Sequence, residues 1–217
     1  MSAVLARYDF DADTTNSAGA ANITVSSFTG GPGLTEVAHV TTDGQPSGSW
    51  YGENWSTSSD ATAVRDSDLY AWFRVTVDSG MTMSLTNLSF DVKPHGSGPR
   101  SVLVDVIQVG GPISGNLLGN VFYHTDQSQT GELDPASTSG GASTRKVWET
   151  ANFGSSSFTN LTGTYEIRIF GYNAPQSDRE ALIDNIILQG TVTAIPEPSA
   201  FLLYALGSLA WMVRRAR

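Results

Sequence analysis

Short runs of alternating or β-branched apolar residues recur along most of the chain, and they constrain its fold more than any other feature. In the clearest run, Leu69 to Val77, every odd-numbered residue is apolar. Successive side chains of a strand point to opposite faces, so this run predicts one buried face and one that carries Tyr70, Trp72, Arg74 and Thr76. Six other runs also predict strands: Val4 to Phe10, Ile23 to Phe28, Met83 to Val92, Ser101 to Val109, Tyr165 to Tyr172 and Leu182 to Val192.

The order of these strands predicts an all-β fold. No helical period of comparable length appears before residue 198, and turn residues separate nearly all the runs. Many strands without βαβ spacing favour an antiparallel two-sheet β-sandwich of the jelly-roll type, in which the strands near Val4 and Val192 pair. Two turn-rich stretches, Thr29 to Asp68 and Thr125 to Ser143, are expected to form surface loops.

Composition narrows the chemistry that the body can support. The chain has no cysteine, which excludes disulfides and thiolate metal sites. Without Glu197 and the three arginines near the C-terminus, the body keeps nine basic and twenty acidic residues, a net charge of −11. Such a surface repels phosphate backbones, so we expect no nucleic-acid partner.

The C-terminal residues differ from the body. Three parts follow in order: a glutamate between two prolines, an apolar run and a basic end (Pro196-Glu197-Pro198, Ser199 to Val213, and Arg214, Arg215 and Arg217). The prolines hold the glutamate in an extended segment. Residues 199–213 predict one short hydrophobic helix, which is shorter than the about 20 residues that usually span a bilayer. Because this helix is apolar on every face and basic at its end, we expect a membrane anchor with a cytoplasmic arginine stop; the alternative is a helix packed into the body.

A proline-glutamate-proline motif, a short hydrophobic helix and an arginine-rich end closely resemble the PEP-CTERM sorting signal of bacterial exosortase substrates. The resemblance covers Ile195 to Arg217 and divides the chain into a β-sandwich domain, residues 1–193, and a sorting and anchoring segment, residues 194–217. It implies export across the inner membrane of a Gram-negative bacterium and temporary anchoring with the body outside the cytoplasm. Cleavage near the motif by the exosortase and delivery to the cell surface or an exopolysaccharide matrix would follow.

The N-terminal residues do not match an exported protein. Met1 to Leu5 has neither a basic start nor an apolar stretch before Arg7, so the expected signal peptide is missing from this chain. Two explanations remain open: a signal peptide encoded upstream of Met1, which we prefer, or a protein that is not exported.

The body resembles the jelly-roll domain often found ahead of a PEP-CTERM tail. The resemblance covers about residues 4–193 and depends on Leu88-Ser89-Phe90-Asp91, Gly98-Pro99-Arg100, the strand Tyr165 to Tyr172, and Ile183-Asp184-Asn185-Ile186. This outline is similar to that of carbohydrate-binding modules and of other concanavalin-like or galactose-binding-like sandwiches, and a fold of this kind does not fix the ligand. We expect a non-enzymatic body. The alternatives are a carbohydrate-binding module that retains polysaccharide and a secreted glycoside-active enzyme.

Three aromatic residues form the strongest candidate for a sugar site. Trp50, Tyr51 and Trp55 lie in a polar stretch with Glu53 and Asn54, whose side chains can bond hydroxyl groups. Exposed rings would stack on sugars. The alternative is that these rings pin a long loop onto the sandwich.

Alternating aspartates predict a calcium site. Asp9 and Asp11 lie near the first strand and Asp184 lies in the last one, so pairing of these strands would gather oxygen ligands. Solvated carboxylates at a sheet edge are the alternative. We find no motif for nucleophilic catalysis, and the three histidines are scattered singly without zinc spacing, so no catalytic residue is assigned.

Overall fold

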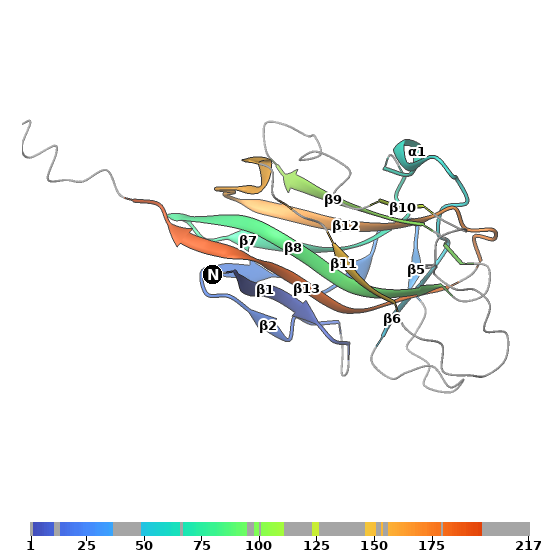
Figure 1. Cartoon of the computed structure of the whole chain (residues 1–217), viewed down its shortest axis with the longest axis horizontal. Helices are drawn as coiled ribbons and strands as arrows, with labels where there is room; N and C mark the ends of the chain where they lie inside the picture. The colour runs from blue at the N-terminus through green and yellow to red at the C-terminus, as the bar shows by residue number, and fades with distance from the viewer. Residues whose placement is uncertain are drawn as a thin grey trace, which may run out of the picture.

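A computed structural model of the chain describes residues 2–10, 14–36, 49–65, 67–94, 98–99, 101–110, 123–125, 146–150, 153, 156–178 and 180–196. These residues form two antiparallel sheets that pack face to face (Figure 1). Every strand pairing among them is antiparallel. The predicted all-β, two-sheet antiparallel sandwich is therefore confirmed.

The seven-stranded sheet is built around two long strands, β8 (Met81–Pro94) and β13 (Ala181–Ala194). Its strand order is β11-β8-β13-β1-β2, with β6 also paired to β13 and β5 to β6. The other strands of this sheet are β1 (Ala3–Tyr8), β2 (Ala18–Gly19), β5 (Thr35–Glu36), β6 (Trp50–Glu53) and β11 (Lys146–Thr150). β1 pairs with β13 from Ala3↔Gly190 to Tyr8↔Ile186, which confirms that the first and last strands lie side by side.

The six-stranded sheet has the order β10-β9-β12-β7-β3, with β4 also paired to β7. Its strands are β3 (Ile23–Val25), β4 (Thr29–Gly30), β7 (Tyr70–Val77), β9 (Ser101–Val109), β10 (Tyr123–Thr125) and β12 (Thr164–Tyr172). Two short helices, α1 (Ala61–Arg65) and η2 (Ser156–Phe158), complete the described structure.

The main core lies between the sheets and contains the inward residues that alternation predicts. On β7, Ala71, Phe73, Val75 and Val77 all join this core. A smaller apolar cluster lies on the outer face of the six-stranded sheet, where Val64 of α1 packs with Tyr70, Leu103, Phe170 and Tyr172. One end of that outer face is therefore covered by α1. Farther along, β7 and β12 carry mainly polar side chains there.

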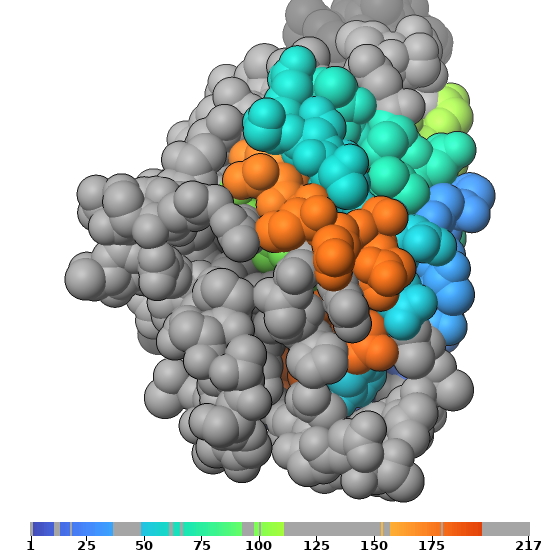
Figure 2. Space-filling model, turned by 90° about the vertical axis from the view of Figure 1, so that its right-hand side faces the viewer, coloured from blue at the N-terminus to red at the C-terminus, as the bar shows by residue number. Residues whose placement is uncertain are grey.

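The stretch Thr29 to Asp68 is more than the surface loop expected from its turn residues. It contributes β4, β5, β6 and α1, and its tryptophans enter the core. Residues 49–60 are held against the β12–β13 connection, since Asn54 N–H donates to Ser177 O at 2.8 Å and Asn173 N–H donates to Ser58 O at 2.9 Å. Figure 2 shows the two segments side by side at one end of the sandwich, in cyan and orange.

The chain leaves the sandwich at the other end. β13 ends at Ala194, and Ile195 N–H donates to Gly80 O at 2.8 Å. Pro196 is the last described residue, so Glu197, Pro198, the expected helix 199–213 and the basic end lie outside the described residues, as does most of Thr125 to Ser143. Within the part of the chain that is described, no helix is long and apolar enough to cross a membrane.

Candidate functional site

The aromatic residues expected to bind sugar are buried. Trp50 and Tyr51 are each 5% exposed and Trp55 is 1% exposed. Trp50 and Trp55 belong to the core between the sheets, where their rings meet at 6.2 Å and 80°. These rings are not exposed as expected. Trp50 and Tyr51 lie on β6, which pairs with β13, and Trp55 lies two residues after the end of β6.

Two glycines allow the tryptophans to pack this closely. A Cβ atom on Gly52 would lie 2.5 Å from the Trp50 ring, and a Cβ atom on Gly171 would lie 2.6 Å from the Trp55 ring. The Trp55 indole N–H donates to Gly52 O at 2.6 Å. These contacts pin residues 49–60 to the sandwich, the alternative that the sequence left open.

The aspartates of the expected calcium site are only partly brought together. Asp184 lies on β13, Asp9 follows the end of β1, and Asp11 lies outside the described residues. Asp184 instead pairs in register with Asp91 on the neighbouring strand β8. The Asn185 side-chain amide donates to Asp91 Oδ2 at 2.7 Å and to Asp184 Oδ2 at 3.4 Å. No group of three acidic or histidine residues suitable for a metal ion occurs among the described residues. Calcium therefore stays a prediction.

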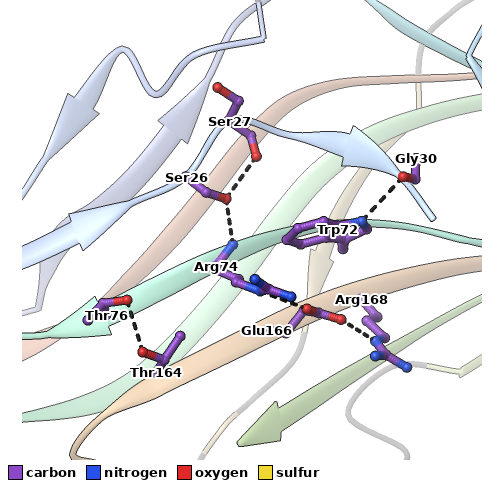
Figure 3. Close-up of polar contacts among 9 residues, drawn as sticks. All are labelled: Ser26, Ser27, Gly30, Trp72, Arg74, Thr76, Thr164, Glu166 and Arg168. Atoms are coloured by element: carbon purple, nitrogen blue, oxygen red, sulfur yellow. Dashed lines mark hydrogen bonds and ion pairs between the residues drawn. The ribbon is translucent and has the colours of Figure 1, made fainter. Parts of the chain in front are cut away.

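The outer face of the six-stranded sheet gathers a different set of side chains. The polar face predicted for β7 pairs with the polar face of β12: Thr76↔Thr164, Arg74↔Glu166 and Trp72↔Arg168. This group, which we call the arginine–tryptophan face, consists of Trp72, Arg74, Thr76, Thr164, Glu166 and Arg168. Figure 3 shows these side chains with the contacts that join them.

A buried glutamate organises the arginine–tryptophan face. Glu166 is 4% exposed in its side chain and accepts from Arg74 Nε at 2.9 Å and from Arg168 Nε at 2.6 Å. Arg74 and Arg168 are 45% and 23% exposed. A buried carboxylate is favourable only when it is paired and hydrogen-bonded, and two guanidinium groups meet that requirement here.

Aromatic rings support both guanidinium groups. The Arg74 guanidinium carbon lies 4.6 Å from the centroid of the Trp72 ring, and that of Arg168 lies 4.1 Å from the centroid of the Tyr70 ring. Cations are attracted to ring faces at such distances. Burial raises the pKa of the Tyr70 hydroxyl, and the positive charge of Arg168 acts in the opposite direction. The half-buried Trp72 is itself fixed, since its indole N–H donates to Gly30 O at 3.3 Å.

A third arginine and a second acid border this face at the end covered by α1. Arg65 Nε lies 3.2 Å from Asp105 Oδ2, and the Asp105 side chain is 1% exposed. Burial raises the pKa of the Asp105 carboxyl, while Arg65 and Arg168 lower it. The short helix therefore closes one end of the face with an ion pair.

Sequence reasoning assigned these strands and their polar faces but did not select the face as a site. The signal was present in the alternation: two strands each carry arginine on the side opposite the core. What the sequence lacks is the register, which brings Arg74 beside Glu166, 92 residues later in the chain, and beside Arg168.

Comparison with known proteins finds distant likeness among solved structures. No family model matches the chain, and no curated protein matches it. Among solved structures the chain is similar to a carbohydrate-binding module, TmCBM27, described in terms of specific mannan recognition. The identity is 12% and the TM-score is 0.36, over 88% of this chain and 99% of that chain.

Proposed function

We propose that this protein is a non-catalytic β-sandwich that binds carbohydrate on its arginine–tryptophan face. The observation that carries the proposal is the row of a half-buried Trp72, two partly exposed guanidinium groups and the paired hydroxyls of Thr76 and Thr164, 3.1 Å apart, on one sheet. Sugar sites combine an aromatic surface with a few fixed polar groups that bond hydroxyls. Antiparallel strands hold these groups rigidly, which lowers the entropy cost of binding.

Binding of purified protein to an array of oligosaccharides tests this proposal. We expect retention of at least one glycan, lost in Trp72→Ala and kept in Val4→Ala, which shortens an exposed side chain on the other sheet. Retention that survives Trp72→Ala would contradict the assigned face. Release of reducing sugar by the wild-type protein would instead support the alternative, a glycoside-active enzyme.

We also propose that the C-terminal segment places the body at the cell envelope. The support is the order of Pro196-Glu197-Pro198, the apolar run 199–213 and the basic residues Arg214, Arg215 and Arg217, together with the end of β13 at Ala194 just before the motif. An extended motif directly after the folded body is accessible to a membrane protease such as an exosortase. The arginines hold the far end of the helix at the inner membrane.

Immunoblots of fractionated cells that express the full precursor with its exosortase test this placement. We expect a processed form from the wild type, and an unprocessed membrane form from Glu197→Ala and from deletion of residues 214–217. Normal release of both variants would refute the proposed sorting. The body variant Val4→Ala is the control, because it lies far along the sequence from the segment.

A further inference from the structure

The donor groups of the arginine–tryptophan face define which sugars it can take. Arg74 and Arg168 each use Nε to bond Glu166. Their terminal Nη groups have no hydrogen-bond or ion-pair partner among the described residues. Each guanidinium therefore keeps an edge of N–H donors for a group outside the protein.

The charge of this cluster is opposite to that of the whole chain. Arg74, Arg168 and Glu166 together carry an excess of one positive charge, whereas the full chain carries −9. The Arg65–Asp105 ion pair beside them adds no net charge, and the negative charge of the exposed Asp68 also acts on Tyr70. Because surface charges separated by more than about 8 Å are screened at physiological salt, an anion placed against the two guanidinium groups responds mainly to these neighbours and not to the net charge of the chain.

The two guanidinium groups are also held in place before any ligand arrives. Each is fixed on one side by Glu166 and rests on a ring, Trp72 under Arg74 and Tyr70 under Arg168. A planar fork of this kind matches the two oxygens of a carboxylate and forms paired charge-assisted bonds. Fixing the side chains in advance reduces the entropy lost on binding.

We propose that the arginine–tryptophan face recognises acidic polysaccharide through the carboxylate groups of its uronic-acid units, with the Nη groups of Arg74 and Arg168 as donors. The inference depends on the carbohydrate-binding function proposed above. It adds the class of ligand, because a polyanionic sugar chain is expected to bind more tightly than a neutral one. The carboxylate of the sugar, and not its ring hydroxyls, distinguishes the two ligands. Raised salt weakens such binding because the attraction is electrostatic.

Isothermal titration of the full chain with oligogalacturonate, its methyl-esterified form, a sulfated oligosaccharide and neutral mannan oligosaccharide tests the inference. We expect oligogalacturonate to bind at least tenfold more tightly than the methyl ester, and more weakly at high salt. Arg74→Gln should remove this preference. Arg74→Lys should keep part of it, because charge remains while the fork is lost. Arg7→Gln, the same charge change at an exposed residue of β1, should leave it unchanged.

The possible results separate the two proposals. Equal binding of the acid and its ester, or binding of neutral mannan alone, would overturn the carboxylate preference and leave carbohydrate binding in place. Preference for the sulfated sugar would overturn it as well. No binding to any of the four sugars would count against both. Because the ester is altered on the ligand, the comparison holds even where an arginine variant fails to fold.

Discussion

Asn185 joins two buried carboxylates of neighbouring strands. Its backbone has φ of 50° next to a β-bulge, and its side-chain amide donates to Asp91 and Asp184. Asparagine tolerates this left-handed conformation better than other residues with a Cβ atom. A single residue therefore supplies both the turn of the backbone and the donor between like charges.

Replacing Asn185 should separate these two roles. Asn185→Gly and Asn185→Ala both lose the amide, and each should lower the free energy of unfolding by about 1–3 kcal/mol. Alanine should cost about 1 kcal/mol more than glycine, because its Cβ atom opposes the positive φ. Urea unfolding of the three proteins measures both effects. Wild-type stability in the alanine variant would show that the amide is dispensable.

Asp105 makes stability depend on pH. Its pKa is raised above the ordinary 3.8, chiefly by burial. A raised carboxyl pKa means that the stability linked to this group is fully present below pH 3.8 and is lost as pH rises through the folded-state value. Asp105→Asn cannot titrate. The stability of the wild type relative to this variant should therefore fall as the pH rises from below 3.8 toward neutral.

Urea unfolding of wild type and Asp105→Asn across this range gives the measurement, and Asp78→Asn on an exposed turn is the control. If the wild type instead becomes more stable than Asp105→Asn as the pH rises toward neutral, the ion pair with Arg65 outweighs the cost of burying the Asp105 carboxylate.

At the scale of elements, the contact of Trp55 with Gly171 packs the segment that follows β6 against β12. A Cβ atom on Gly171 would overlap the Trp55 ring and lie 2.9 Å from Pro99 Cγ. Gly171→Ala should lower the free energy of unfolding by about 1–3 kcal/mol through overpacking. In a Trp55→Leu background the same change should cost less, since the smaller side chain leaves room. Thermal unfolding of the four proteins measures the coupling, and additive losses would contradict this contact.

The strands show what sequence patterns can and cannot predict. Alternation or dense β-branched content predicted β7 and β9 almost to the residue, and the order of the strands predicted the pairing of the terminal strands. It missed α1, which is too short to show a helical period. It also placed Trp50 in a loop, since polar neighbours hide a strand of only four residues that pairs with β13. Trp55 does lie outside the strands, and its burial was the alternative that the sequence left open.

At the scale of the whole molecule, β13 is an interior strand of the seven-stranded sheet, between β8 and β1. Residues Gly190–Ala194 pair with Met81–Leu85, and Gly190 also pairs with Ala3. A chain that ends after Pro196 keeps every described strand, so its Tm should equal that of the full chain. A chain ending after Gln189 loses these pairs, and its Tm should fall by about 5–10 °C. Calorimetry of both truncations measures the effect. Equal Tm values would show that the last five residues of β13, Gly190–Ala194, add no stability.

The exit of the chain from β13 has a mechanical consequence for a tethered protein. Ladder hydrogen bonds run across the strand axis, and β13 is bonded to β8 on one side and to β1 and β6 on the other. Figure 1 shows β13 running lengthwise through the sandwich to the end where Ile195 leaves. A pull at Ile195 is directed along β13, so it loads these bonds together in shear rather than peeling them one by one. Tension between an anchored C-terminus and a captured polymer would thus meet the sheet in its most resistant direction.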